Sequence, residues 1–400
     1  MSTKIRFYLI ILFISVFAAC KKDNDTMQTE QVEENRFVRL LVADAEDKTI
    51  TFINPKDGAQ SSFQAQFAAN NIYPTNSKRF AGVVNTANNH VSFFDSGVEA
   101  HGDHAHLKGT PKWALTTALA AKPTHFYSLG NEIAVFNDGD ASLSIVTEDK
   151  LHTQAQTNHV VVDQAHHGAV VVFANGTYAV TQKDNSISGA LPERVKIVNA
   201  TGQVIHTSTV ATKGIHGDAG DGNTAIFGTV GGMLIVKSDG TQSLVNWPSE
   251  IGEANWLSTI YYGKGSQKFL GFKSKFGAFV LNPVNNSFTK VVTANNIRSA
   301  VFDAEGKDIL VLLEDGTVQL YSGSSLIKLQ EIKLNVSFGT GALVPNVTAT
   351  KHFVYVTNPN GGEIIQLERG NFAKQSKIAV AGKPAKIIML GADFDDEGNH

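Results

Sequence analysis

A short cluster of histidines is the most chemically suggestive feature of the sequence. His101, His104 and His106 lie within six residues, together with the carboxylate of Asp103. Imidazole nitrogens and carboxylate oxygens are ligands that zinc and other divalent transition metals accept. Gly102 favours a loop, in which several side chains can turn toward one ion. The segment therefore predicts a metal site, and the alternative is a solvated polar loop.

A second set of histidines recurs at similar places in the chain. His125, His167 and His216 each lie near the start of an apolar segment, in successive units of the sequence. If these segments are neighbouring strands around one channel, the three imidazoles could share an ion. His166 or Asp218 would then supply a fourth ligand or orient one of the three. The alternative is that these histidines are structural.

The elements that would position these residues form a repeat. From residue 37 onward, apolar strands and tight turns recur with a period of about 45 residues, which is typical of propeller blades. The chain has 35 glycines and only 10 prolines, and its apolar runs are short. We therefore predict an all-β fold, a β-propeller, with His101–His106 inserted in the second blade. Eight blades fit the count, and seven fit if one unit is miscounted.

The C-terminal segment predicts how the ring closes. Gly382–Gly391 repeats the form of Ala121–Gly130, which opens the third blade as an innermost strand. Little chain follows Gly391, whereas the first blade lacks an innermost strand. The simplest arrangement is that the C-terminal strand completes blade one and leaves no free sheet edge.

The N-terminus has the pattern of a lipoprotein signal. Two basic residues precede an apolar run at 7–17, and small residues precede Cys20, the only cysteine. We expect a signal peptide at 1–19, lipidation of Cys20, a disordered tether at 20–36 and a single propeller domain at 37–400. A run of eleven residues is too short to span a bilayer core of about 30 Å.

Composition and motifs exclude several function classes. The net charge is −3 and no long basic run occurs, so nucleic acid is not an expected partner. The sequence has no Gly-rich phosphate loop, no GxSxG elbow and no HExxH helix. We expect a monomer.

The histidine segments, taken in order, resemble a known family. His-Gly-Asp-His-Ala-His at 101–106, then His-His-Gly at 166–168 and Ile-His-Gly-Asp at 215–218, are similar to the periplasmic zinc metallochaperones of the AztD type. The resemblance implies a β-propeller that binds Zn²⁺ and hands it to the solute-binding protein of an ABC zinc importer. It implicates both groups of ligands: His101, Asp103, His104 and His106 in a mobile loop, and His125, His167 and His216 at the channel mouth.

The resemblance and the N-terminal signal together suggest an extracytoplasmic protein, in the periplasm or at the outer membrane of a Gram-negative bacterium. Members of that family are soluble, whereas this chain carries a lipidation signal, so the membrane leaflet and the partner stay open. Nickel, copper and cobalt also accept such ligands. Two other functions remain: a zinc-dependent hydrolase or lyase, with Asp218 as its base, and an interaction module without metal. We also expect the 101–106 loop to reach over the mouth lined by His167 and His216, as part of that site or as a second one.

Overall fold

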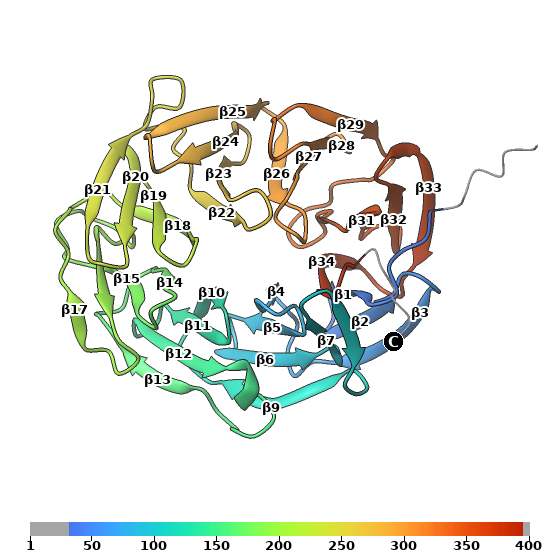
Figure 1. The fold of residues 1–400 in the computed structure, drawn as a ribbon, viewed down its shortest axis with the longest axis horizontal. Helices are drawn as coiled ribbons and strands as arrows, with labels where there is room; N and C mark the ends of the chain where they lie inside the picture. The colour runs from blue at the N-terminus through green and yellow to red at the C-terminus, as the bar shows by residue number, and fades with distance from the viewer. Residues whose placement is uncertain (1–31, 395–400) are drawn as a thin grey trace, which may run out of the picture. The chain divides into compact units, whose positions relative to one another are not determined.

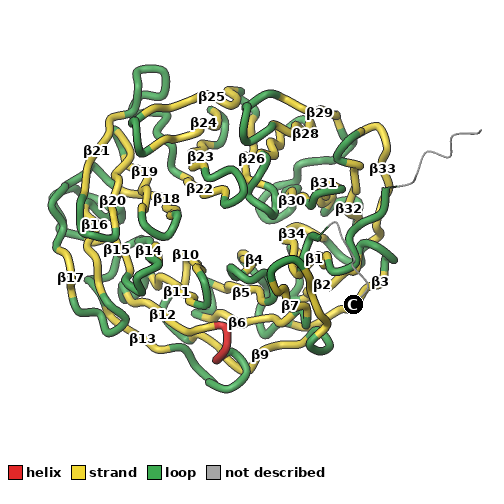
Figure 2. Tube along the Cα trace, viewed as in Figure 1, coloured by secondary structure: helices red, strands yellow, loops and turns green. Residues whose placement is uncertain are grey.

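The structure is a computed structural model that describes residues 32–394 (Figure 1). The expected signal peptide and Cys20 lie outside the described residues. Within the part described, strands are joined by turns and loops, and the helical content is one short 3₁₀ turn, Glu148–Lys150 (Figure 2). No helix in residues 32–394 is long and apolar enough to cross a membrane.

Eight four-stranded antiparallel sheets form a ring around a central channel, so the prediction of an eight-bladed propeller is confirmed (Figure 1). The first four blades, each given from the innermost strand outward, are β34 (Pro384–Gly391), β1 (Val38–Asp44), β2 (Thr49–Asn54) and β3 (Ala59–Gln64); β4 (Asn71–Pro74), β5 (Phe80–Asn85), β6 (His90–Asp95) and β9 (Lys112–Ala118); β10 (Pro123–Leu129), β11 (Glu132–Asn137), β12 (Ser142–Thr147) and β13 (Asn158–Val161); β14 (Val170–Val172), β15 (Tyr178–Gln182), β16 (Arg194–Val198) and β17 (Val204–His206).

The remaining four blades follow the same order. They are β18 (Ile215–Gly220), β19 (Thr224–Thr229), β20 (Gly232–Lys237) and β21 (Gln242–Asn246); β22 (Thr259–Gly263), β23 (Lys268–Lys273), β24 (Gly277–Asn282) and β25 (Ser287–Thr293); β26 (Ile297–Phe302), β27 (Ile309–Leu313), β28 (Thr317–Tyr321) and β29 (Lys328–Lys333); β30 (Val347–Ala349), β31 (Phe353–Asn358), β32 (Glu363–Glu368) and β33 (Asn371–Ala379).

The C-terminal strand closes the ring as predicted. β34 pairs antiparallel with β1, and Leu41 lies opposite Ile388. The first blade therefore combines both ends of the propeller domain, and its innermost strand comes from the last part of the chain.

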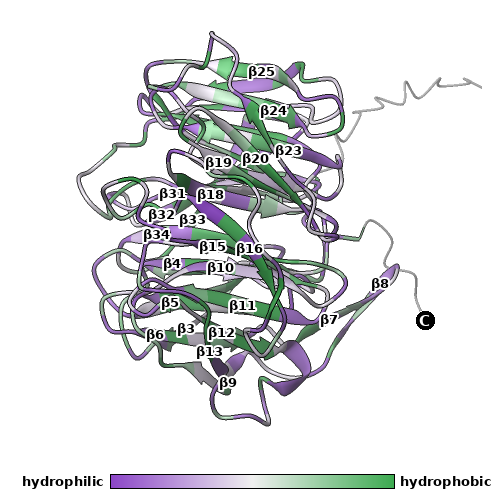
Figure 3. Ribbon diagram, turned by 90° about the vertical axis from the view of Figure 1, so that its left-hand side faces the viewer, coloured by the Kyte–Doolittle hydropathy of each residue, from purple (hydrophilic) through white to green (hydrophobic). Residues whose placement is uncertain are grey.

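The hydrophobic core lies between successive blades. Middle strands are apolar on both faces, because each sheet is covered by a neighbour on either side. One such cluster joins Phe136 and Leu143 of blade three to Val170, Tyr178 and Val180 of blade four, all fully or almost fully buried. In the side view of Figure 3, middle strands such as β11 are coloured as hydrophobic. This packing fixes each innermost strand relative to the next.

We call the channel end where the innermost strands begin the first mouth, and the end where they finish the second mouth. Several innermost strands have a register shift near their start, including β10 at Pro123/His125, β18 at Ile215/Asp218 and β26 at Ile297/Ser299. A bulge of this kind redirects a side chain. Irregular strand starts therefore place polar side chains at the first mouth.

Ordered contacts begin before the predicted start of the domain at residue 37. Glu34 is only 3% exposed and accepts hydrogen bonds from the hydroxyls of Thr350 and Tyr355. The side chain of Asn35 donates to Asp393. Burial raises the pKa of Glu34 despite these hydrogen bonds. The last residues of the segment assigned to the tether thus pack against the propeller.

Candidate metal sites

The second histidine set comes together at the first mouth, with His125 on β10, His216 on β18 and His167 just before β14. Blades three, four and five contribute His125, His167 and His216, which we call the channel triad. The ring centroids lie 5.5 Å apart for His125 and His167, 6.1 Å for His125 and His216, and 5.1 Å for His167 and His216. The predicted convergence of these imidazoles is therefore present in the structure.

Each triad ring is oriented by a hydrogen bond from Nδ1. His125 donates to Oδ1 of Asp218 at 2.8 Å, and His167 donates to Oδ2 of Asp138 at 2.6 Å. His216 donates to the carbonyl oxygen of Ser258 at 2.8 Å. Ionised carboxylates and carbonyls only accept, so these contacts assign the proton of each neutral ring to Nδ1. The Nε2 lone pairs are then available, as in histidine ligands oriented by a carboxylate.

Burial and charge act differently on the triad. Burial lowers the pKa of His216, which favours the neutral form that a metal requires. Burial also opposes protonation of His125, but the hydrogen bond and charge of Asp218 outweigh it and raise the pKa of His125. Burial would raise the pKa of Asp138, yet its bonds with His167 and Thr124 hold it below the ordinary value.

The triad rings are close but not yet in coordination geometry. Zinc–nitrogen bonds of about 2.1 Å would put the ring centroids of tetrahedral ligands about 5 Å apart. The observed separations reach 6.1 Å. Among residues 32–394, no group of three or more His, Cys, Asp or Glu side chains is already arranged to hold an ion. An ion bound by all three rings would draw His125 and His216 together.

His166 does not join the triad. Its Nδ1 donates to the carbonyl of Gln164 at 2.7 Å, and its Nε2 lies 2.9 Å from the hydroxyl of Thr181. The side chain is 1% exposed and packs against Phe136. Both ring nitrogens thus serve the interior of the propeller, and the expectation of His166 as a ligand is not supported. Asp218 was expected either as a fourth ligand or as a group that orients a histidine, and in the structure it orients His125.

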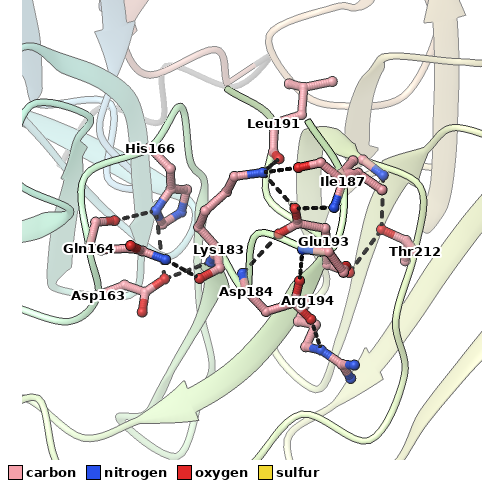
Figure 4. Close-up of polar contacts among 12 residues, drawn as sticks. Asp163, Gln164, His166, Lys183, Asp184, Ile187, Leu191, Glu193, Arg194 and Thr212 are labelled. Carbon is pink, nitrogen blue, oxygen red and sulfur yellow. Dashed lines mark hydrogen bonds and ion pairs between the residues drawn. The ribbon is translucent and has the colours of Figure 1, made fainter. Parts of the chain in front are cut away.

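The connection between β15 and β16 contacts the backbone of His167 and is itself held in place by a buried charge pair. The backbone N–H of His167 donates to the carbonyl of Ala190 at 3.2 Å, in the connection between β15 and β16. Figure 4 shows how buried Lys183 holds that connection, since its amine donates to the carbonyls of Ile187 and Leu191. The same amine pairs with Glu193 at 2.5 Å, where both side chains are almost fully buried. The loop is therefore fixed by a charge pair rather than by an apolar core.

A cavity of about 1030 Å³ opens the channel toward the second mouth. Its lining includes Asp218, the side chain that orients His125, together with Tyr127 and Tyr261. Through Asp218, the triad is thus one hydrogen bond away from a space large enough for solvated ions.

The first histidine set forms a β-hairpin, not the irregular loop expected from Gly102. β7 (Val98–His101) pairs with β8 (His104–Leu107), and Figure 3 shows the hairpin projecting from the ring. Gly102 adopts a φ of 59° at the two-residue turn. Alternation in the strands explains the difference, since Val98 and Ala105 are buried against Ala392.

The opposite face of the hairpin carries the histidines. His101 lies opposite His104, and His106 lies opposite Glu99, so the four side chains share one face. Ring centroids are 4.9 Å apart for His104 and His106, 5.7 Å for His101 and His106, and 6.0 Å for His101 and His104. Asp103 occupies the turn and accepts a hydrogen bond from Nδ1 of His104 at 3.0 Å. The hairpin thus brings together three exposed imidazoles, the exposed carboxylate of Asp103 and the half-buried carboxylate of Glu99.

Glu99 is a candidate ligand that the sequence reasoning missed. Its carboxylate lies 3.5 Å from Nε2 of His101, 3.5 Å from Arg79 and 3.4 Å from Lys108. The strand alternation Glu99-Ala-His101 could have indicated it. Asp138 was also missed as a site residue, because its partner His167 belongs to the next blade.

The two clusters lie at opposite channel ends, so the expectation of a hairpin reaching over the triad is wrong. The third strand of each blade runs parallel to the innermost strand and finishes at the second mouth. The hairpin follows Asp95 at the end of β6 and packs on Ala392, just beyond the end of β34. The triad lies where β10 and β18 begin. The clusters are therefore two separate candidate sites.

Comparison with known proteins adds a functional context. No protein-family model matches the chain. The zinc chaperone AztD of Citrobacter koseri is 25% identical over 383 residues, which cover 90% of this chain and 88% of that protein. The crystal structure of Citrobacter koseri AztD has a TM-score of 0.80 at 25% identity and covers 90% of this chain and 100% of that chain.

The resemblance to the AztD-type zinc chaperones is confirmed. The apo structure of AztD from Citrobacter koseri gives a TM-score of 0.79 at 23% identity, again over 90% of this chain. The dihydro-heme d1 dehydrogenase NirN shares the fold alone, with a TM-score of 0.61 at 12% identity. Because the match to AztD covers 90% of this chain, it extends over most of the propeller that carries both histidine clusters.

Proposed function

We propose that this protein is an extracytoplasmic zinc metallochaperone that passes Zn²⁺ to a transport partner by ligand exchange. The observation that carries the proposal is the orientation of the channel triad: three Nδ1 protons are bound by oxygen acceptors, which leaves three Nε2 atoms for an ion. The zinc chaperone AztD, similar over 90% of this chain, supports zinc as the cargo.

Two sites of different character suit transfer. The channel triad is partly buried and pre-oriented, which favours retention of zinc. The hairpin histidines are exposed, with His101 and His104 showing 46% and 48% of their side-chain surface. Exposed ligands can be replaced one at a time by those of a partner. We infer that the hairpin exchanges zinc and the triad stores it.

The partner we propose is the solute-binding protein of an ABC zinc importer, and Cys20 would hold the chaperone on a membrane through a lipid. An enzymatic role has weaker support, because its candidate base, Asp218, is hydrogen-bonded to His125. The similarity to a zinc chaperone also favours a role in metal transfer over catalysis.

A competition titration tests the proposal. Zinc should bind wild-type protein at two sites, His167→Ala should remove one, and His104→Ala should remove the other. We expect each substitution to lower the zinc affinity of its own site by at least about tenfold. The control is His206→Ala on the outer strand β17, which should bind like wild type. Unchanged zinc binding in both site variants would refute the proposal.

Affinity should also depend on pH. Ligating imidazoles must be neutral, so bound zinc should be released as the pH falls through the histidine range near about 6.5. Titration of zinc at several pH values, with a metal indicator, measures this directly.

A further inference from the structure

The first mouth carries two cations on the side of the ring away from the triad. Lys386 is the third residue of β34 in blade one, and Arg298 is the second residue of β26 in blade seven. The triad occupies blades three to five, centred on blade four. In a ring of eight, blade four faces blade eight, which lies between blades seven and one. The two cations therefore flank the wall opposite the histidines.

The two cations have no counter-ion among the described residues. Neither side chain has a hydrogen bond or an ion pair within residues 32–394. Lys386 is half-buried, and both burial and the charge of Arg298 lower its pKa. Two other lysines away from solvent are paired, half-buried Lys78 with Glu305 and buried Lys183 with Glu193, each at 2.5 Å. An unpaired half-buried ammonium beside a second cation is costly, which indicates a missing anion.

Lys386 lines a channel cavity of about 420 Å³, which is large enough to accept a small anion. The lining also contains hydrogen-bond donors, including Tyr73, Tyr261 and Thr348. Burial raises the pKa of both tyrosines, to about 12 for Tyr73, so their hydroxyls keep their protons at neutral pH. The cavity thus combines an ammonium with neutral donors.

The acidic group in this cavity does not neutralise Lys386. Asp303 lines the cavity, but its Oδ2 accepts a hydrogen bond from Arg369 at 2.7 Å. Arg369 also pairs with Asp308 at 2.6 Å. Asp303 is therefore already committed to a separate charge cluster at the ends of blades seven and eight.

We propose that Lys386, Arg298 and the cavity beside them form an anion site for a carboxylate group. The carboxylate is either a free small carboxylate or a Glu or Asp side chain of a protein that docks at the first mouth. A planar guanidinium and an ammonium both bind carboxylates by charge-assisted hydrogen bonds. The site goes beyond zinc transfer, but it would place a negative charge across the channel from the triad.

Binding of citrate to metal-free protein tests the site. Calorimetry should show citrate binding by wild type that weakens at least about tenfold in Lys386→Gln, because a charge-assisted bond is lost. Arg298→Gln should have a smaller effect, since Arg298 is exposed. The control Lys290→Gln removes the same charge from the exposed outer strand β25 and should bind citrate like wild type.

A peptide distinguishes the two sources of the carboxylate. A short Glu-containing peptide that binds more tightly than its Gln counterpart, in a manner dependent on Lys386, assigns the site to a protein side chain. Citrate binding without peptide binding assigns it to a free anion. Equal citrate binding by wild type and Lys386→Gln, or none by wild type, overturns the proposal. Metal-free conditions make this result independent of zinc affinity.

Folding of the key variant can be checked separately. Lys386→Gln removes an unpaired charge, so it should melt at the same temperature as wild type or higher in citrate-free buffer. Citrate should raise the melting temperature of wild type and not that of Lys386→Gln. A lower melting temperature of the variant without citrate would contradict the idea that Lys386 lacks a counter-ion.

Discussion

His125 donates a hydrogen bond from Nδ1 to Oδ1 of Asp218 at 2.8 Å, although the two residues belong to blades three and five. Blade four lies between them in the ring and contributes His167, which donates to Asp138 of blade three. The two bonds together link three blades at the first mouth. The bond to Asp218 fixes the ring of His125 so that Nε2 is the nitrogen open to an ion.

Asp218→Asn should weaken zinc binding at the channel triad by about 10–100-fold, the usual effect of losing a carboxylate behind a histidine ligand. The pKa of His125 should fall, because burial would no longer be outweighed by Asp218. Zinc titration across pH measures both effects, and Asp239→Asn, in an exposed turn, is the matched control. An unchanged zinc affinity would show that Asp218 does not support zinc binding at the triad.

Glu99→Gln should weaken zinc binding at the hairpin and leave the triad unaffected. Glu99 shares a face with His101, His104 and His106. The substitution removes a negative charge that would either bind the ion directly or lie next to it. Titration in a His167→Ala background isolates the hairpin. The control is Glu46→Gln at an exposed turn. If Glu99→Gln leaves zinc binding unchanged in the His167→Ala background, the assignment of Glu99 to the hairpin site is wrong.

Asp95→Asn should destabilise the base of the hairpin. The buried carboxylate pairs with Arg79 at 3.0 Å and with His152 at 2.8 Å. Burial would raise the pKa of Asp95, but these bonds hold it below its ordinary value of 3.8. Loss of this pairing should cost about 3 kcal/mol in the free energy of unfolding at pH 7.

The pH dependence of that loss has a definite sign. A carboxyl whose pKa is depressed by folding stabilises the protein above the unfolded value, and the contribution disappears as the pH falls through the folded value. The difference between wild type and Asp95→Asn should therefore be constant near neutrality and shrink below about pH 4. Urea unfolding at several pH values measures it, with Glu250→Gln as an exposed control. A difference that grows in acid would contradict the assignment.

Lys183→Met should release the loop behind His167. The change leaves Glu193, which is fully buried, without its cation, and we expect a loss of about 3–5 kcal/mol in unfolding free energy. Hydrogen exchange should increase in the β15–β16 connection before other blades are affected. Lys237→Met, at an exposed strand end, controls for the loss of charge. Wild-type exchange in the connection would show that the pair does not hold it.

The architecture was predictable because each blade repeats the same pattern, and Gly382–Gly391 matches a known innermost strand in form. The channel triad was predictable for the same reason, since matched positions in a ring become neighbours. Asp138 and Ser258 could not be assigned as partners, because the contacts join different blades. Gly102 led to the prediction of a loop, although apolar and polar residues alternate on both sides of it, which is the pattern of two strands. Its position at the second mouth follows from strand direction, which the spacing of histidines does not reveal.

The pairing of β34 with β1 has a consequence for how the protein is made. Leu41 cannot meet Ile388 until almost the whole polypeptide has been synthesised, because the partners are separated by nearly the full length of the domain. Contacts this distant in sequence form slowly. Blades three to five, whose strands are all contiguous, can assemble first. The histidines of the channel can thus be in place while the first blade still waits for its innermost strand, and a chain shortened by its last strand would expose the edge of β1 to other nascent chains.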